Sequence, residues 1–504
     1  MRSATAFVAF LFFLPLQAAP ARFEDQGYAF RVSVYANANS APNSIPYERI
    51  DGLVLAFVNP VDDCRGFSST TIPWAKEIVR RARAEHAKGH PIDVTFAIGG
   101  GGNLVANQRL EGIASREDCR KLFAGQVARI VAENDLSGVD LDWEFPKPTS
   151  LGNYTLLVQA LREAIGTKIL SIAIYDDGGR EKATGLTRAV FPFVDYYMVM
   201  AYLSPGKNAI DGWVNPPWDI PESKLRLGLA FFGDPDNGGA GVAHNRLLKM
   251  VPASQTSPCG DRLAMYTVNG LRTTRELTRF AMTEKLGGVT AWELGHDRTD
   301  SISLLRAASE TARMWEDFAE WQPRTKYPAG TVIQNQGNLW MVRSPSAKAE
   351  PGLKNRAYLQ YERLNEWSDQ RFYCGGEAVW FAGTVYRAVR DPMLSETDLS
   401  PRGDPSLWTA LYKAPRYDES RTYEKGERVF FDSSVYVARQ TTRGVSPAEA
   451  ASWSPFVDTE AFDSATAYSA GATVRYMGNR YISTKASKGL NPVVATDVWQ
   501  PLRK

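Results

Sequence analysis

Three carboxylic acids lie close together in one short segment of the chain. Asp140, Asp142 and Glu144 alternate with apolar residues, so on a β-strand they share one face. Three crowded carboxylates cannot all ionise cheaply, and we therefore expect at least one pKa to be raised. A carboxyl group that stays protonated near neutral pH can protonate a leaving group. The pattern predicts general acid chemistry.

Two alternatives apply to the same triplet. An acidic strand without a role is disfavoured, because inward-facing acids on an otherwise apolar strand are costly unless they are used. A hard cation is the second alternative, since such ions prefer clustered carboxylates, and the triplet alone leaves it open. The four histidines are widely spread and the four cysteines lack CxxC spacing, which argues against a metal centre built on them.

The elements that would position the acids lie between residues 28 and 315. Short β-branched runs alternate there with helix-patterned stretches, which predicts a (β/α)8 barrel with the acids at its C-terminal mouth. A doubly wound open sheet is the rival fold, but no glycine-rich fingerprint opens the first strand–helix turn. Residues 99–102 are all glycine but lack a P-loop lysine, so no nucleotide is expected there. The expected strands are 30–35, 52–58, 93–98, 138–144, 169–175, 195–202, 226–231 and 288–292, and expected helices include 75–88, 116–133, 154–165 and 273–285, with Ser115 as a helix start.

A fourfold repeat replaces this texture from about residue 321. Aromatic, glycine and β-branched residues recur at fixed offsets, which predicts four small β-modules with glycine turns and aromatic cores. A β-propeller has a similar period but a different signature. The fold class is thus α/β, a TIM barrel followed by four small all-β modules in tandem. The recurring residues are Trp321, Trp367, Tyr417 and Phe462; Tyr327, Tyr373, Tyr423 and Tyr468; Gly330, Gly376, Gly426 and Gly471; Ile333, Val379, Val429 and Val474; Gly337, Gly383, Ser433 and Gly478; Trp340, Tyr386, Tyr436 and Tyr481; and Tyr358, Trp408, Trp453 and Trp499.

The N-terminal residues are typical of a secretory signal peptide. A basic start precedes an apolar run from residue 7 to 14, which is too short to span a bilayer, and small residues follow it. We expect residues 1–21 as signal peptide, 22–315 as barrel, and modules at 321–366, 367–416, 417–461 and 462–504. The chain is expected to be secreted and monomeric, without a membrane anchor. Its net charge of +2 gives no reason to expect nucleic acid. Four cysteines allow three pairings, and we favour Cys64 with Cys119.

The barrel region resembles family-18 glycoside hydrolases, the chitinase family, whose fourth strand carries D-G-x-D-x-D-x-E. This chain reads S-G-V-D-L-D-W-E-F-P from Ser137 to Pro146. The family's third-strand S-x-G-G pattern appears as Ala97-Ile98-Gly99-Gly100, its sixth-strand M-x-Y-D pattern as Met200-Ala201-Tyr202-Leu203, and its eighth-strand tryptophan as Trp292.

The resemblance implies substrate-assisted hydrolysis of an N-acetylglucosamine polymer. Glu144 would be the general acid and then the base, Asp142 would orient the substrate's acetamide, and Asp140 would tune Asp142. Neither a metal, a cofactor nor a protein nucleophile is implied. The expected substrate-binding residues are Tyr202, Trp292, Met200, Gly99 and Gly100, with Tyr35 at the end of the first strand as a further candidate. Trp213 and Trp218 are read equally as sugar platforms or as loop packing.

Three departures from the family pattern are relevant to activity. Ser137 replaces the outermost aspartate, Ala97 replaces a serine that supports the inner aspartate, and Leu203 replaces the aspartate after the tyrosine. The leading hypothesis is cleavage of β-1,4 bonds in chitin. An endo-β-N-acetylglucosaminidase acting on N-glycans, or a non-catalytic chitin-binding lectin on a degenerate barrel, remain open.

The C-terminal repeats resemble carbohydrate-binding modules of families 5 and 12. The recurring aromatic, Y-x-x-G-x-x-V and G-x-x-Y positions carry the resemblance, together with distal prolines such as Pro492. The tryptophan pair that such modules commonly present to sugar is absent, so spacer or protein-contact modules remain an alternative. Tethered sugar binders would raise the effective substrate concentration.

Overall fold

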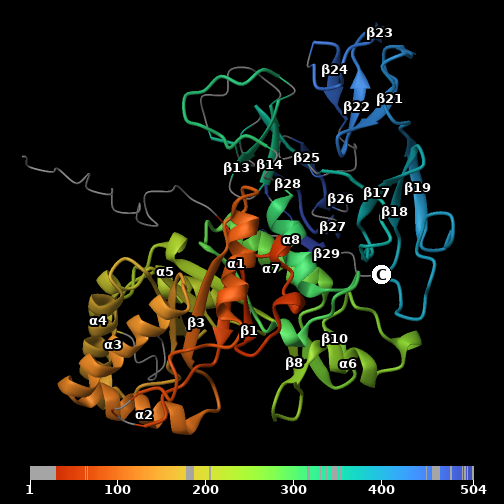
Figure 1. Cartoon of the computed structure of the whole chain (residues 1–504). Coiled ribbons are helices and arrows are strands. Elements are labelled where there is room, and N and C mark those ends of the chain that lie inside the picture. Colours follow the sequence, from red (N-terminus) through yellow and green to blue (C-terminus); the bar gives the residue numbers. More distant parts are fainter. Residues whose placement is uncertain are drawn as a thin grey trace, which may run out of the picture.

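A computed structural model shows the chain as a barrel followed by a series of small sheets (Figure 1). No helix in the part of the chain that the structure describes is long and apolar enough to cross a membrane. The expected signal peptide lies outside the described residues. These are 30–501 without 63, 65, 177–186, 204, 205, 315–317, 330, 336, 337, 343–349, 352–354, 356, 362, 450, 457–461, 463–465, 471, 477, 478, 491, 493, 494, 496 and 497.

Eight parallel strands close the barrel, as the sequence predicts. They are β1 (Arg31–Asn37), β2 (Gly52–Ala56), β3 (Asp93–Gly99), β4 (Gly138–Asp142), β5 (Ile169–Ile174), β6 (Tyr196–Val199), β7 (Leu225–Ala230) and β12 (Gly288–Trp292), in the order β1-β12-β7-β6-β5-β4-β3-β2. The expected fourth strand was too long, because β4 ends at Asp142 and Glu144 lies two residues beyond it. The last acid is therefore on the loop at the barrel mouth.

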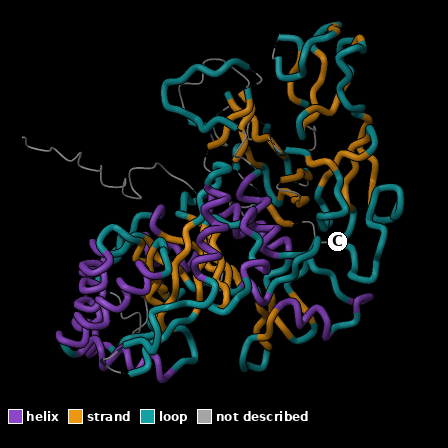
Figure 2. The backbone as a smooth tube through the Cα atoms, in the orientation of Figure 1, coloured by secondary structure: helices purple, strands orange, loops and turns teal. Residues whose placement is uncertain are grey.

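Helices cover the outside of the barrel (Figure 2). They are α1 (Ala75–His86), α2 (Leu104–Ser115), α3 (Glu117–Glu133), α4 (Leu151–Ile165), α5 (Gly206–Val214), α6 (His244–Met250), α7 (Leu271–Thr283) and α8 (Leu304–Arg313). The prediction that Ser115 caps a helix start was wrong. Ser115 ends α2, where its hydroxyl donates to the Gly112 carbonyl oxygen at 2.8 Å, and Arg116 precedes α3 without a side-chain cap. Two helices, α2 and α3, thus occupy one β–α crossover.

The alternation of side chains divides the barrel strands into an outer and an inner face. Val139, Leu141 and Trp143 point outward and are buried in the large core beneath the helices. A smaller apolar cluster fills the barrel interior and consists of Tyr35, Val54, Ala56, Ala97, Ala173, Tyr196 and Met198, with Phe57, Ile169, Met200 and Trp292 partly buried against it. The acids of β4 enter this inner cluster.

A small subdomain that the sequence did not predict follows β7. It contains β8 (Phe232–Pro235), β9 (Val242–Ala243), β10 (Arg262–Leu263) and β11 (Tyr266–Val268), which form a sheet ordered β10-β11-β8-β9, together with α6. These strands are two to four residues long. Runs that short carry no readable periodicity, so the sequence offered no signal for them.

The C-terminal region consists of small antiparallel sheets, and we keep the names modules 1 to 4 for the ranges given above. Module 1 contains β13 (Val332–Asn335), β14 (Asn338–Val342), β15 (Tyr358–Tyr361) and β16 (Asn365–Glu366); module 2 contains β17 (Ala378–Phe381), β18 (Thr384–Ala388) and β19 (Trp408–Lys413). Module 3 contains β20 (Thr422–Tyr423), β21 (Arg428–Phe431), β22 (Ser434–Ala438), β23 (Thr442–Arg443) and β24 (Trp453–Pro455). Module 4 contains β25 (Ala467–Tyr468), β26 (Thr473–Tyr476), β27 (Asn479–Ser483), β28 (Ser487–Lys488) and β29 (Trp499–Pro501). Strand β16 pairs with β17, across the expected border at residue 367.

The recurring residues do in the modules what the sequence predicts. Each module has its own cluster built from the repeated aromatic and β-branched positions. Gly383 and Ser433 adopt positive φ angles of 87° and 54° in the tight turns that join β17 to β18 and β21 to β22. The corresponding Gly337 and Gly478 lie outside the described residues. In module 3 the Tyr423 hydroxyl accepts a hydrogen bond from the Asp418 backbone N–H at 2.7 Å.

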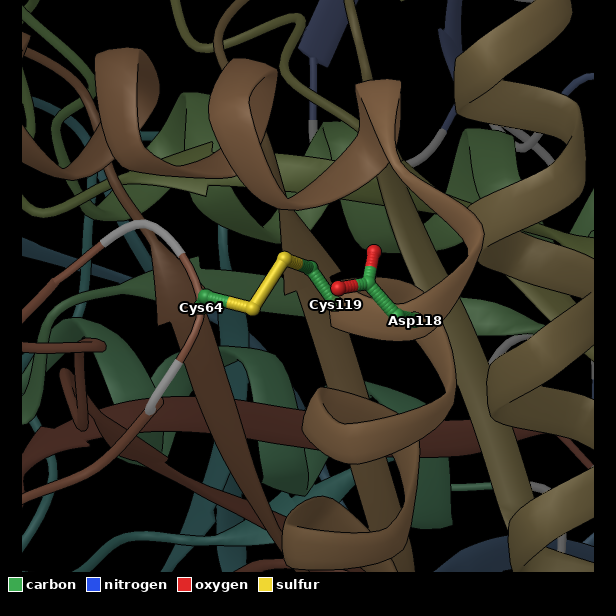
Figure 3. Close-up of side chains that lie close together, drawn as sticks. All are labelled: Cys64, Asp118 and Cys119. Carbon is green, nitrogen blue, oxygen red and sulfur yellow. A yellow bond between two sulfur atoms is a disulfide. The ribbon is translucent and has the colours of Figure 1, made fainter.

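Two disulfides join distant segments. Cys64 pairs with Cys119, as favoured from the sequence, and links the loop after β2 to the first turn of α3 (Figure 3). Cys259 pairs with Cys374 and fastens module 2 to the barrel. Asp118 lies beside the first pair and Asp391 beside the second. The four sulfur atoms are bonded in two separate pairs, so none is a thiolate ligand for a metal.

Ion pairs reinforce the attachment of module 2. Arg275 of α7 contacts Glu377 at 2.8 Å, and its guanidinium donates to the Phe372 carbonyl oxygen at 2.9 Å. Arg272 pairs with Asp391 at 2.5 Å. Burial raises the pKa of the Glu377 carboxyl, but Arg275 and Arg371 outweigh this effect and hold it at about 2. Module 2 is therefore fixed against the side of the barrel.

Candidate active site

Asp140 lies at the centre of the barrel interior and is fully buried. The Tyr35 hydroxyl from β1 donates to its Oδ2 at 2.9 Å, and the Ser171 hydroxyl from β5 donates to its Oδ1 at 2.6 Å. Burial raises the pKa of the Asp140 carboxyl, whereas these two hydrogen bonds and the charge of Arg226 lower it. The donors thus offset much of the cost of burying a carboxylate.

Asp142 and Glu144 form a coupled pair above Asp140. Asp142 is buried, and Glu144 is half-buried at the mouth. Their carboxyl groups share a hydrogen bond, and the Gly101 backbone N–H also donates to Glu144. Burial first, and then the charges of Glu144 and Asp140, raise the pKa of Asp142 well above its usual value. Burial also raises the pKa of Glu144. The pair therefore retains a proton at a pH where isolated carboxyls have lost theirs.

The glycines after β3 let this loop approach the end of β4. Gly99 and Gly100 have φ angles of 112° and 96°, which favour glycine. The Gly100 N–H donates to the Asp142 carbonyl oxygen at 2.7 Å. A Cβ atom on Gly99 would overlap that same carbonyl, and one on Gly100 would overlap the Phe57 ring. These glycines are needed for the approach of protein backbone and ring, and not solely of a ligand.

Two asparagines fix the loops that carry the site, and the sequence reading missed both. Asn107 of α2 donates to the Glu144 carbonyl oxygen at 2.8 Å and accepts from the Glu144 N–H at 3.3 Å. Asn59 makes the same pair of bonds to Gly99, at 3.0 and 2.7 Å. A side-chain amide thus pairs with both the backbone N–H and the backbone C=O of one residue. The backbone at the mouth is thus held by two side-chain amides.

Tyr202 and Trp292 lie beside the acids. Burial, followed by the charges of Asp142 and Glu144, raises the pKa of the Tyr202 hydroxyl, so it remains a donor at all ordinary pH values. The Trp292 ring is half-buried and meets Tyr35 edge-on, with centroids 5.2 Å apart. It stacks on Phe57 at 5.4 Å. Met200 is partly buried in the same inner cluster. The structure thus places the site residues expected from the sequence in the barrel interior and at its mouth.

Trp213 and Trp218 pack against each other beside the barrel. Trp213 is completely buried in α5, and its indole N–H donates to the Tyr175 carbonyl oxygen at 2.9 Å. Trp218 packs against it with ring centroids 5.1 Å apart. The packing interpretation is confirmed for Trp213, whereas Trp218 is half-buried. Tyr175 itself is 47% exposed at the end of β5, and its ring meets that of Phe145 at 5.4 Å.

A buried cation lies deeper in the barrel. Arg226 on β7 is 2% exposed, and its guanidinium lies 3.5 Å from the centroid of the Tyr196 ring. It donates to the Ser33 hydroxyl oxygen at 2.9 Å. Sequence reasoning missed Arg226 and Ser171, although each is a polar residue at an inward position of an otherwise apolar strand. That exception to the pattern was the available signal.

The comparisons with known proteins point to one family. The model for family 18 of the glycosyl hydrolases matches residues 26–297, more than half of the chain. A class V chitinase, CHIT5a from Medicago truncatula, is 23% identical over 337 residues, which cover 53% of this chain and 86% of the relative. A probable chitinase 2 from Drosophila melanogaster is 29% identical over 236 residues, covering 40% and 46% of the two chains.

Solved structures of similar proteins cover the same region. A family-18 chitinase, ChiB from Flavobacterium johnsoniae, is 20% identical with a TM-score of 0.48, and the match covers 56% of this chain and 94% of that one. A class V chitinase from Nicotiana tobaccum in complex with NAG4 is 19% identical with a TM-score of 0.47, covering 56% and 98%. The match of the family model over the barrel leads to one conclusion: the chain belongs to family 18 of the glycosyl hydrolases.

Proposed function

We propose that the protein is a secreted hydrolase that cleaves β-1,4 bonds in chitin or a related N-acetylglucosamine polymer. The observation that carries this proposal is the hydrogen-bonded Asp142–Glu144 pair with raised pKa values, placed at the barrel mouth above Asp140. One member of such a pair can hold the proton that a leaving group needs. Relatives in the family are chitinases.

Glu144 would act first as an acid. Its proton passes to the glycosidic oxygen while the substrate's own acetamide oxygen attacks the anomeric carbon and the glycosidic bond breaks. Asp142 would accept a hydrogen bond from the acetamide N–H and stabilise the positive charge that develops there. The Tyr202 hydroxyl would donate to the acetamide oxygen. The Glu144 carboxylate then takes a proton from water, which opens the cyclic intermediate with net retention.

The residues around the pair suit a sugar chain. Trp292 presents a half-buried ring at the mouth, on which an apolar sugar face could lie. Phe145 directly follows the catalytic acid and meets the exposed Tyr175 ring. Leu104 and Val105, just after the glycine loop, are 74% and 53% exposed. This exposed apolar rim favours an extended ligand over a small one.

Secretion is part of the proposal. The apolar N-terminal segment supports it, as do the two disulfides, because such bonds persist in oxidising compartments. Detection of the mature chain, starting near residue 22, in the medium of producing cells would test it. An intact N-terminus on cell-associated protein would contradict it.

We also propose that the C-terminal modules contact the polymer, as carbohydrate-binding modules do. Their fourfold repetition supports this role through multivalency. The repeated rings themselves are core residues in each module. Sugar contacts would therefore come from other positions, and binding of the E144Q chain to chitin before and after removal of residues 417–504 would measure them.

The hydrolysis proposal is tested by comparing the wild type with Glu144→Gln. We expect wild type to cut chitin hexamers and E144Q to be at least about 1000-fold slower. Glu293 offers a matched control, because it is a half-buried carboxyl near the mouth whose pKa burial also raises. The variant E293Q should keep its activity. If E144Q still cleaves the hexamer, the assignment of Glu144 as the general acid is wrong.

The substrate is decided in the same assay. If a high-mannose glycoprotein is cut in preference to chitin, the hypothesis that the substrate is an N-glycan would replace the hypothesis that it is chitin. Binding of chitin without any cleavage would favour the hypothesis of a non-catalytic lectin. Proton NMR of the first products should show the β-anomer, since the substrate-assisted route retains configuration. An initial α-anomer would rule that route out.

A further inference from the structure

The general acid of the proposed reaction lies on a loop, and a helix from an earlier part of the chain holds its backbone. Glu144 is two residues beyond the end of β4, and Asn107 is on α2, 37 residues before it. Resting on the function proposed above, we propose that Asn107 is a positioning residue for the reaction. Its side-chain amide holds the Glu144 backbone and so fixes the place from which the Glu144 carboxyl protonates the leaving group.

The contact uses both polar groups of the Glu144 backbone. Asn107 Nδ2 donates to the Glu144 carbonyl oxygen at 2.8 Å, and its Oδ1 accepts from the Glu144 N–H at 3.3 Å. Glu144 lies outside the strand ladder of β4, so these bonds replace the partners that a strand would supply. A single hydrogen bond would let the residue swing about it. Two bonds to one planar amide fix both the position and the orientation of the Glu144 backbone.

Helix α2 is a firm base for this contact. Its inner face is anchored in the large core by Leu110 and Ile113, which are completely buried. One turn after Asn107, the Glu111 carboxylate accepts from the Lys147 backbone N–H at 3.0 Å. Residues four apart lie on the same face of a helix. One face of α2 therefore holds the loop after β4 at two points, of which the first is the acid itself.

The contacts of the Glu144 carboxyl leave little room for a shift of its backbone. The Gly101 N–H donates to this carboxyl, and a Cβ atom on Gly101 would lie only 2.9 Å from Glu144 Oε2. Asp142 shares a hydrogen bond with the same carboxyl. A reacting group that is misplaced by about 1 Å can lose about 100-fold in rate. Loss of the Asn107 contact should therefore impair proton transfer more than substrate binding.

The test compares two substrates whose leaving groups differ in their need for an acid. Chitin hexamer releases a sugar hydroxyl, which needs the proton from Glu144, whereas the dinitrophenyl glycoside of the N-acetylglucosamine dimer releases a phenolate that is stable without a proton. We expect Asn107→Ala to lower kcat on hexamer about 30-fold, with KM little changed. The release of dinitrophenolate in the first turnover should stay within about twofold of wild type.

Three further variants define what the comparison measures. E144Q lacks the acid, so it should lose activity on hexamer and keep the first turnover of the dinitrophenyl substrate. Asn107→Asp keeps the acceptor but replaces the group that donates to the Glu144 carbonyl oxygen, and it should also slow the hexamer alone. Gln108 is an exposed amide next to Asn107 on α2. Gln108→Ala is the matched control and should leave both rates unchanged.

Two results would overturn the proposal and leave the proposed function standing. One is an N107A enzyme with wild-type kcat on hexamer while E144Q is inactive on it. The other is an equal loss on both substrates, which would show that Asn107 supports the fold of the site and not the acid.

The failure of the proposed function would be distinct from both results, because wild type would then cleave neither substrate. Hydrogen exchange at the Glu144 backbone N–H would still test the contact. Exchange about tenfold faster in N107A than in Q108A would support the contact, and equal exchange would reject it.

Discussion

The barrel and the C-terminal modules bury aromatic residues for different purposes. Inside the barrel, tyrosine hydroxyls reach other side chains, as Tyr35 does with Asp140. Inside the modules, several tryptophan and tyrosine polar atoms instead reach backbone groups, although the hydroxyls of Tyr361 and Tyr436 both meet the Ser434 side chain. The Trp453 indole N–H, for example, donates to the Val445 carbonyl oxygen at 2.9 Å. The first arrangement positions a charge, and the second closes a turn.

The charges of the two regions differ in the same way. Asp140, Asp142 and Arg226 lie within the barrel, where each needs partners to offset its burial. The hydrophobic clusters of the modules are built from rings and aliphatic groups, although module 2 also buries Arg387. Nothing in the folding of a barrel requires an acid at its centre. Residues that repeat therefore indicate structure here, whereas a buried charge can indicate chemistry, as at Asp140, or a structural ion pair, as between Arg275 and Glu377.

The change Asp142→Asn should have the largest effect on rate. It keeps the shape of the side chain but removes the carboxylate that stabilises the developing charge. We expect kcat on chitin hexamer to fall about 1000-fold, equivalent to about 4 kcal/mol of transition-state stabilisation. Steady-state kinetics measures this. A loss of less than tenfold would show that Asp142 does not stabilise the developing charge.

The same variant should gain stability where the wild type is penalised. The folded-state pKa of Asp142 is raised, so the folded protein favours the protonated acid. The stability that it contributes is complete below the ordinary carboxyl pKa and is lost as the pH rises through the folded-state pKa. D142N should therefore unfold at a higher temperature than wild type at pH 7.5, with the difference shrinking toward pH 3.5. A wild type that is the more stable protein at pH 7.5 would contradict this.

In the modules, Trp453→Ala should separate structure from activity. The Trp453 side chain is 1% exposed and packs against Tyr423 with ring centroids 5.3 Å apart. Its loss should cost module 3 about 3–4 kcal/mol of unfolding free energy, measured by hydrogen exchange, with kcat on soluble hexamer unchanged. Trp74→Ala makes the same change at a 58% exposed site and should cost far less. A drop in kcat in W453A would show that catalysis in the barrel depends on the structure of module 3.

The sequence predicted the fold where patterns are long or repeated. Eight strands with helices between them and four copies with fixed offsets are each supported by many residues, so single exceptions did not mislead. The subdomain from β8 to β11 was missed because its strands are too short to show a period. The bond between Cys259 and Cys374 followed from the sequence only as the remainder of the favoured Cys64–Cys119 pairing, because no local pattern connects residues that are 115 positions apart.

From residue patterns alone, the site was predicted only as far as it lies on one strand. Its residues on other strands, such as Tyr202 and Trp292, were expected from the family resemblance. Alternation placed Asp140 and Asp142 together, because neighbours on one face are adjacent in sequence. The partners of these acids come from other strands, and only the closed barrel brings Ser171 and Arg226 near them. The hydrogen bond from the Asn107 side chain to the Glu144 carbonyl oxygen depends on loop geometry, which leaves no periodic pattern in the sequence.

Removing the Cys259–Cys374 bond should destabilise module 2 without changing the activity of the barrel. We expect the double change of both residues to serine to cost about 3 kcal/mol, mainly in module 2, because the bond closes a long loop. Activity on hexamer should persist, since Arg275 and Glu377 still hold the contact. Thermal unfolding followed by protease mapping measures this. The corresponding change at Cys64 and Cys119 is the control and should instead destabilise the barrel.

The smallest expected effect concerns the rim of the barrel. Tyr175 is exposed beside Phe145, so its ring is free to meet a sugar that extends past the cleavage point. Tyr175→Ala should raise KM for chitin hexamer about fivefold, equivalent to about 1 kcal/mol, and should leave kcat unchanged. Tyr175→Phe keeps the ring and should match wild type. If the two variants weaken binding equally, the hydroxyl and not the ring contacts the substrate. If neither variant weakens binding, the exposed Tyr175 ring does not contact sugar, and in this respect it resembles the buried rings of the modules.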